Sequence, residues 1–298
     1  MYHTPVLLDE SINGLMLTKG GIYVDATFGG GGHSKEILKQ LKGGKLFAFD
    51  RDPDAAKNAI NDKRFMMINA DYRYIRNYLR LHDAIPCDGI LADLGISSHQ
   101  IDIPERGFST RYEGALDMRM DSRAEVSAAG IINDYAEEEL AQIFWKFGEI
   151  SNSRKLAGSI AAARQKKKIH STSDLKAIAA ACAPRAQEHK YLARVFQAIR
   201  IEVNKELEAL EEFLQKSLQV LKPGGRIVVI SYHSLEDRLV KNFMRSGNIK
   251  GIKEQDFYGN IKSEIQALTR KPVLPTEEEI AGNPRARSAR LRIGEKIK

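Results

Sequence analysis

The feature that most constrains this 298-residue chain is a glycine-rich run, Asp25-Ala-Thr-Phe-Gly-Gly-Gly-Gly-His33, which Asp50 follows seventeen residues later. The run lies between a short apolar stretch, 21–24, and a helical pattern that opens at Ser34. Glycines at a strand-to-helix turn let the backbone approach a ligand, because no Cβ stands in the way. The helix N-terminus that follows presents unpaired N–H groups. This pattern predicts a nucleoside-binding βαβ unit in which Asp50 accepts both hydroxyls of a ribose.

Apolar runs alternate with helical patterns through the first hundred residues. This alternation is typical of a parallel sheet covered by helices on both faces. The predicted strands are 21–28, 45–50, 65–68, 88–94, 226–231, 265–269 and 288–293. One long helix is expected over 192–221, because its apolar residues fall on a single stripe and Pro223-Gly-Gly225 ends the pattern.

The segment from 104 to about 190 shows helical patterns and no convincing strand. One face at helical spacing is formed by Leu140, Ile143, Phe144 and Phe147. Ser171-x-x-Asp174 resembles a capping box at the start of another helix. We therefore predict an α/β fold with a Rossmann-like seven-strand core, formed by 1–103 and 192–298, and an inserted all-helical domain at 104–191.

The composition argues against several classes of protein. Two cysteines, Cys87 and Cys182, are too few for a disulfide framework and lack the spacing of metal ligands. The seven histidines are scattered, so the sequence predicts no metal site. No apolar run approaches the roughly 18 residues of a membrane span, and the first residues do not resemble a signal peptide. We expect a cytoplasmic protein without membrane association.

The formal net charge of +7 favours a polyanionic partner. Residues 285–298 hold six Lys or Arg and one Glu, which suits either a phosphate-facing strip or a solvated terminal strand. Within the predicted insertion, the candidates for RNA contact are Arg106, Arg111, Arg119, Arg123, Arg164, Lys166, Lys167 and Lys168. Such charges position phosphates without reading sequence. A solvated helix face is the alternative for the lysine run.

Three cofactor classes use a glycine turn of this kind. A dinucleotide fingerprint needs glycine where Ser34 stands, and a P-loop needs Gly-Lys-Ser/Thr, which does not follow these glycines. S-adenosyl-L-methionine remains, with its methionine tail along the turn and its ribose at Asp50. A simple cap at the strand end is the alternative for Asp50.

Ligands of such sheets bind beyond the carboxyl ends of the strands. Tyr72 follows the third predicted strand and could stack on adenine, although packing with Tyr74 and Tyr78 explains it equally well. Asp93 ends the fourth predicted strand and would border both the cofactor and the acceptor. Gln100, two residues past a double serine, could line the same cleft.

Ordered motifs extend over nearly the whole chain. They are His3-Thr-Pro-Val-Leu-Leu-Asp-Glu10, the glycine run through Ser34, Asp50-Arg-Asp-Pro53, Asp93-Leu-Gly-Ile-Ser-Ser98, Arg106-Gly-Phe-Ser109, Leu116-Asp-Met-Arg-Met-Asp121, Phe196-Gln-Ala-Ile-Arg-Ile201, Ser231-Tyr-His-Ser-Leu-Glu-Asp-Arg238 and Asn283-Pro-Arg-Ala-Arg-Ser288. In these motifs the chain resembles the RsmH (MraW) family, bacterial methyltransferases that act on N4 of a cytidine in 16S rRNA. The resemblance implies a class I methyltransferase core with an inserted helical domain. It also implies cofactor contacts at Gly31, Gly32, His33, Asp50, Tyr72, Asp93 and Gln100.

Three positions depart from the usual family pattern. Tyr72 and Tyr232 stand where phenylalanine is familiar, and His99 replaces an expected proline. None of these changes removes a charged or cofactor-bearing group.

The N4 amine of cytosine is a poor nucleophile, because its lone pair is delocalised into the ring. Methyl transfer therefore needs in-line placement of N4, which in the best cases supplies on the order of 7–11 kcal/mol of the barrier. It also needs acceptors for the amine hydrogens. We predict that Asp93, or a carbonyl near it, accepts an amine hydrogen and that His233 assists with the proton. Cofactor binding alone is the alternative for Asp93, and a structural hydrogen bond is the alternative for His233.

The predicted function is S-adenosylmethionine-dependent methylation of the N4 amine of a specific cytidine in the decoding centre (P site) of 16S rRNA. The implied partner is 16S rRNA or the small ribosomal subunit, and the sequence specifies no oligomeric state. The alternatives are N4-cytosine methylation of another nucleic acid, an NAD-dependent oxidoreductase, and a non-catalytic RNA-binding protein. The missing third glycine counts against the oxidoreductase, and the absent Asp/Asn-Pro-Pro-aromatic turn counts against a DNA substrate.

Overall fold

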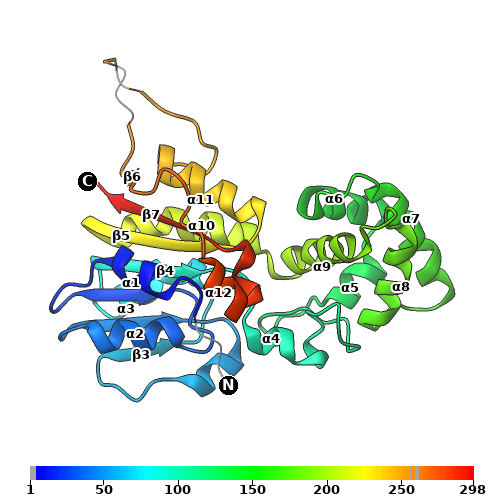
Figure 1. The fold of residues 1–298 in the computed structure, drawn as a ribbon, viewed down its shortest axis with the longest axis horizontal. Helices are drawn as coiled ribbons and strands as arrows, with labels where there is room; N and C mark the ends of the chain where they lie inside the picture. Colours follow the sequence, from blue (N-terminus) through cyan, green and yellow to red (C-terminus); the bar gives the residue numbers. More distant parts are fainter. Residues whose placement is uncertain (1–4, 256, 259–261) are drawn as a thin grey trace. The chain divides into compact units, whose positions relative to one another are not determined.

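Seven strands form one sheet in the order β3-β2-β1-β4-β5-β7-β6 (Figure 1). The computed structural model describes residues 5–255, 257–258 and 262–298, so His3 and Thr4 of the first motif lie outside the described residues. The strands are β1 (Ile22–Asp25), β2 (Lys45–Phe49), β3 (Phe65–Ile68), β4 (Cys87–Asp93), β5 (Leu221–Ser231), β6 (Ile265–Ala267) and β7 (Arg290–Lys296). All seven predicted strands, and with them the α/β fold, are confirmed.

The first five strands are parallel, whereas β7 runs antiparallel to both β5 and β6. Successive side chains of a strand point to opposite faces, so each strand contributes to two cores. Val24 and Ile90 belong to one core, while Tyr23 and Leu91 belong to the other. Both faces of the sheet are therefore apolar, as expected of strands covered on each side.

Helices of the core supply the covering layers. The first of the two cores includes residues of α3 (Ile75–Leu81), α10 (Glu206–Val220) and α11 (Ser234–Ser246). The second includes residues of α1 (Leu8–Leu15) and α2 (Gly32–Gln40). A short helix, α12 (Glu277–Gly282), precedes β7.

The chain divides into two compact units. We call residues 1–95 with 207–298 the core unit, and residues 96–206 the helical unit. The predicted insertion was 104–191, so the helical unit begins eight residues earlier and ends fifteen residues later. The difference arises because α4 (Ser98–Asp102) starts soon after β4, and because α9 (Glu188–Asn204) packs on α6 (Glu137–Gly148).

The helical unit contains α4 to α9. Its remaining helices are α5 (Ala128–Asp134), α7 (Ser153–Lys166) and α8 (Thr172–Cys182). The predicted apolar face of α6 is confirmed, because all four of its residues are buried. The predicted capping box is confirmed as well: Ser171 and Asp174 exchange hydrogen bonds at the start of α8.

The single helix predicted over 192–221 is wrong. Two helices, α9 and α10, replace it, and the chain breaks at Lys205, whose φ of 48° is left-handed. The apolar stripe continues across this break, so the periodicity alone could not reveal it. β5 also begins at Leu221, five residues earlier than predicted, and its pairing with β4 shifts register between Cys87 and Gly89. Such an irregularity accommodates a Pro-Gly-Gly sequence inside a strand.

Candidate functional site

The glycine turn joins β1 to α2 and is fixed by a buried carboxylate. Asp25, which ends β1, is 1% exposed and accepts hydrogen bonds from the Ser34 hydroxyl (2.6 Å) and the Thr27 N–H (3.2 Å). Burial raises the pKa of Asp25 to about 6. Ser34, whose presence argues against a dinucleotide fingerprint, thus holds the end of β1 through its hydrogen bond to Asp25.

Two glycines of the turn leave no space for a side chain. Gly31 has a φ of 75°, and a Cβ there would lie 2.8 Å from the Phe28 ring. A Cβ on Gly32 would lie 2.2 Å from Cγ of Pro5. Gly31 caps α2 without a side-chain hydrogen bond, so the first N–H groups of the helix have no helical partner. The turn therefore has the open backbone that a nucleoside site requires.

Asp50 follows β2 and faces the same turn. Its Oδ2 accepts a hydrogen bond from the Gly29 N–H (2.7 Å), and its Oδ1 accepts one from the Asp52 N–H (2.8 Å). Each carboxylate oxygen can accept two hydrogen bonds, so each keeps a lone pair for a ribose hydroxyl. Burial raises the pKa of Asp50 to about 6, although the two N–H groups oppose this rise. Asp50 thus ties the glycine turn to β2 and retains its capacity as a ribose acceptor.

Asp93, at the end of β4, is the centre of a second polar group. Its Oδ1 accepts a hydrogen bond from the Tyr232 hydroxyl (2.8 Å), and its backbone N–H donates to Oγ1 of Thr27 (2.7 Å). Its Oδ2 lies 3.9 Å from Nδ1 of His33. Burial raises the pKa of Asp93 to about 6, and the neighbouring charges of Asp25 and Glu236 contribute to that rise.

His33 lies buried beside Asp93. It is 6% exposed, and its Nε2 lies 3.1 Å from the carbonyl oxygen of Val6. The carbonyl oxygen can only accept, so Nε2 carries a proton, and Nδ1 faces Oδ2 of Asp93. Burial lowers the pKa of His33, with Asp93 opposing the change. Four predicted residues, Gly31, Gly32, His33 and Asp93, thus belong to one connected group at the carboxyl ends of β1 and β4.

Tyr72 and Gln100 have structural contacts of their own. Tyr72 begins the 3-10 turn Tyr72–Tyr74 after β3 and packs edge-on against Phe213, with ring centroids 4.9 Å apart. Gln100 is 4% exposed, and its Oε1 accepts the Ser97 N–H at 3.0 Å in a capping box of α4. Gln100 lies in the helical unit, and its predicted cofactor contact stays a prediction, as does adenine stacking by Tyr72.

His233 precedes α11 and caps it. Its Nδ1 accepts the Glu236 N–H (3.4 Å), and Glu236 in turn accepts the Tyr232 N–H (2.9 Å). Among the described residues, Nε2 of His233 is buried and finds no hydrogen-bond partner, although Oε1 of Glu236 lies 3.1 Å away, off the N–H direction. The structural hydrogen bond weighed as the alternative for His233 is therefore present. Assistance with a proton stays a prediction.

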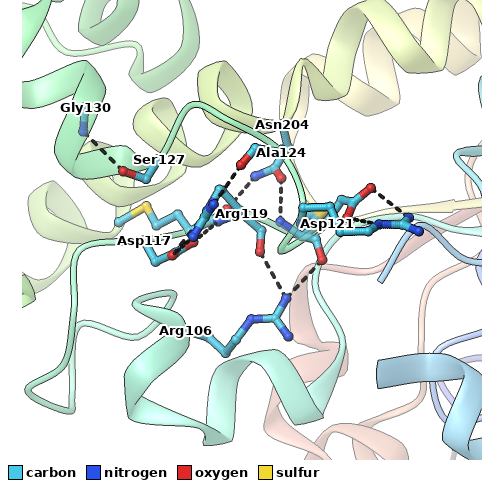
Figure 2. Close-up of polar contacts among 11 residues, drawn as sticks. Arg106, Asp117, Arg119, Asp121, Ala124, Ser127, Gly130 and Asn204 are labelled. Carbon is cyan, nitrogen blue, oxygen red and sulfur yellow. Dashed lines mark hydrogen bonds and ion pairs between the residues drawn. The ribbon is translucent and has the colours of Figure 1, made fainter. Parts of the chain in front are cut away.

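Most of the basic residues predicted to contact RNA in the helical unit donate to partners within that unit. Figure 2 shows the contacts of Arg106 and Arg119. Arg106 donates from Nη2 to the carbonyl oxygens of Arg119 and Met120, both at 3.0 Å. Arg119 forms a two-pronged pair with Asp117, at 2.9 and 2.6 Å. Asn204 accepts the Met120 N–H at 2.7 Å and so ties the same loop to α9. These arginines hold the Leu116–Asp121 motif in place, and RNA contact by them stays a prediction.

Two site residues escaped the sequence reasoning. Thr27 lies inside the glycine-rich run, but only the fold shows that its hydroxyl receives the N–H of Asp93, 66 residues away. Tyr232 was noted as a departure from a phenylalanine, and the added hydroxyl is the group that bonds Asp93. The signal available in the sequence was that Tyr232 departs from the family's phenylalanine within a motif that is otherwise intact.

The sheet order, the glycine turn after β1, the acidic residue after β2 and the acidic residue that ends β4 define a class I, Rossmann-like methyltransferase. The family model described as "MraW methylase family" matches residues 1–297, and the chain belongs to that family. This assignment agrees with the predicted cofactor, S-adenosylmethionine, and excludes the oxidoreductase alternative.

Curated relatives match along their whole lengths. The chain is 55% identical over 298 residues to "Ribosomal RNA small subunit methyltransferase H" of Cytophaga hutchinsonii, covering 99% of this chain and 100% of that protein. It is 54% identical over 297 residues to the protein of the same name from Phocaeicola vulgatus, covering 99% of this chain and 98% of that protein.

Within the part of the chain that the structure describes, none of the helices has both the length and the apolar character needed to traverse a bilayer.

Proposed function

We propose that this protein transfers a methyl group from S-adenosylmethionine to the N4 amine of one cytidine in the decoding centre (P site) of 16S rRNA. The observation that carries the proposal is the setting of Asp93. Its carboxylate ends the strand beside the glycine turn, one oxygen is held by Tyr232, and the other lies 3.9 Å from Nδ1 of His33. The names of the curated relatives support a small-subunit rRNA substrate.

The donor set around the turn fits S-adenosylmethionine. The first N–H groups of α2 and the backbone at Gly31 and Gly32 suit the carboxylate of its methionine tail, and Asp50 suits its ribose. When bound, S-adenosylmethionine supplies an electrophilic methyl group on a positively charged sulfur. Asp25, Asp93 and Glu236 make this region acidic, which favours a cationic ligand electrostatically.

Asp93 has the properties of a proton acceptor for an amine. With a pKa of about 6 it is mostly ionised at neutral pH, and an acceptor works best when its pKa lies near the operating pH. The Tyr232 hydroxyl fixes one carboxylate oxygen, which leaves the other to receive a hydrogen from N4. His233, two residues past β5, would relay that proton only if its Nε2 became accessible.

The acceptor is tested by supplying methyl-labelled S-adenosylmethionine to purified protein with naked 16S rRNA, small ribosomal subunits or DNA. We expect label on small subunits or 16S rRNA. Label on DNA alone would move the protein to the alternative class of nucleic-acid methyltransferase. Binding of RNA without transfer to any acceptor would favour the non-catalytic alternative.

A further inference from the structure

A cavity lies in the core unit, at the edge of the sheet formed by β6. Its volume is about 390 Å³, and it lies among α11, β6 and β7, which Figure 1 shows beside one another. Four cationic side chains line it: Lys241, Arg245, Arg270 and Arg292. No acidic side chain stands among its described lining residues. The cofactor site described above shares none of these residues.

Arg292 gives the cavity a pre-organised cation. It is 6% exposed, and Asp237 holds it through Nε (2.7 Å) and Nη2 (3.1 Å). Among the described residues Nη1 of Arg292 has no hydrogen-bond partner, and this nitrogen is not sealed from solvent. A buried guanidinium fixed along one edge presents its remaining donors in one direction, which suits a phosphate oxygen.

Three exposed cations and four apolar side chains also line the cavity. Lys241 and Arg245 are four residues apart on α11, so they share one face of that helix, and Arg270 follows β6. All three are exposed, and none forms an ion pair within the part of the chain that the structure describes. The apolar residues of the lining are Met244, Ile265, Ala267 and Ile297. Cations beside apolar side chains fit the sugar-phosphate backbone of a nucleotide.

The charge of the chain is concentrated in this region. Residues 241–298, about a fifth of the chain, hold 13 Lys or Arg and 7 Asp or Glu, a net charge of +6 out of +7. Residues 96–206 hold 17 Lys or Arg and 15 Asp or Glu, a net charge of only +2. A polyanion is therefore attracted more strongly to the end of the core unit than to the helical unit.

The sheet register places the backbone of Arg292, at one end of the cavity lining, near the reaction centre. Arg292 pairs with Val229 on β5, which pairs with Ala92 on β4, the neighbour of Asp93. Two strand spacings separate β7 from β4, a distance of about 10 Å. An RNA strand that presents its target base at Asp93 can therefore bring a phosphate a few nucleotides away to Arg292.

We infer that this cavity binds a backbone phosphate of the RNA substrate, with Arg292 as its fixed donor and Lys241, Arg245 and Arg270 as its rim. The inference rests on the proposed function, because it takes RNA as the substrate. Contacts of this kind set the register of a strand without reading its sequence.

The test compares two triple variants that each remove three positive charges. Lys241→Ala, Arg245→Ala and Arg270→Ala are combined in the first. The matched control combines Lys19→Ala, Lys42→Ala and Lys45→Ala, three exposed cations at the amino ends of β1 and β2, the sheet edge away from Asp93. Binding of a 16S rRNA transcript and of S-adenosylmethionine is measured for each, at several salt concentrations.

We expect the rim variant to bind the transcript about tenfold more weakly, the loss that one charge-assisted hydrogen bond represents. Its salt slope should fall by about 0.7 for each lost phosphate contact. S-adenosylmethionine binding and the control variant should be unchanged. Equal weakening in both variants, or in neither, would overturn the inference.

Two further arms separate the remaining possibilities. Inorganic phosphate at millimolar concentration should not displace the transcript, whereas displacement would assign the cavity to a small phosphorylated ligand. If the wild-type protein binds the transcript but methylates no rRNA, the proposed function fails while the rim comparison still decides the inference.

Discussion

The hydroxyl of Tyr232 provides a direct handle on Asp93. Tyr232→Phe removes the hydrogen bond to Oδ1 at 2.8 Å and leaves the ring in place. A hydrogen bond to a charged group contributes about 1.5–3 kcal/mol, which corresponds to about one to two pKa units. Burial raises the pKa of Asp93 to about 6 and the Tyr232 hydrogen bond lowers it, so the loss of this hydrogen bond raises that pKa further.

The consequence is a shift of the pH–rate profile. The carboxylate must be ionised to accept a proton, so activity rises with pH through the pKa of Asp93. For a rise of one to two pKa units, we expect kcat of the variant to fall about two- to tenfold at pH 7 and about five- to fiftyfold at pH 6, and to recover near pH 9. Single-turnover methylation between pH 5.5 and 9 measures this, with Tyr78→Phe as a control that removes a hydroxyl from α3. An unshifted midpoint, or an equal loss at every pH, would refute the role assigned to Asp93.

Three further predictions concern the same region. Because the folded-state pKa of Asp93 is raised from 3.8 to about 6, the folded protein holds this proton more tightly than the unfolded chain, and stability falls as pH rises between those values. Asp93→Asn should remove this pH-dependent loss of stability and raise the free energy of unfolding at pH 7 by up to about 3 kcal/mol, measured by urea titration. It should also abolish most methylation. An unchanged free energy of unfolding would contradict the argument that burial raises the pKa of Asp93. Gly32→Ala places a Cβ 2.2 Å from Pro5. Thermal unfolding should show a loss of about 1–3 kcal/mol in the free energy of unfolding, and calorimetry should show weaker S-adenosylmethionine binding. Gly282→Ala, with open space at its Cβ, is the control and should change neither quantity. His233→Ala removes the N-cap acceptor of α11 and should lower the free energy of unfolding by about 1 kcal/mol, whereas His233→Asn keeps an acceptor there. A stable asparagine variant with full kcat would show that His233 only caps the helix.

Much of the fold was accessible from the sequence, because strand periodicity and turn chemistry are local. The apolar runs at 45–50 and 65–68 needed no tertiary information, and neither did the capping box at Ser171. The break at Lys205 was not accessible, because a lysine in the left-handed region carries no local signal and the apolar stripe continues past it. Such a turn is dictated by the packing of the helices on either side.

The candidate site was likewise only partly predictable from the sequence. The placement of Asp50 and Asp93 at strand ends could be predicted, because parallel strands bring their carboxyl ends to one edge. The partners of Asp93 could not, since Thr27 and Tyr232 follow strands that are distant in sequence, and lie 66 and 139 residues away. The arginines of the helical unit were predicted from charge alone, and charge does not reveal that Arg119 is already paired with Asp117.

The central claim is the identity of the methylated atom. Small ribosomal subunits from cells lacking this protein, incubated with purified protein and methyl-labelled S-adenosylmethionine, can be digested to nucleosides and oligonucleotides and analysed by mass spectrometry. The account predicts a single labelled product, N4-methylated cytidine, at one position of the decoding centre of 16S rRNA. Label on C5 of cytosine, on a ribose, or at another rRNA position would contradict it.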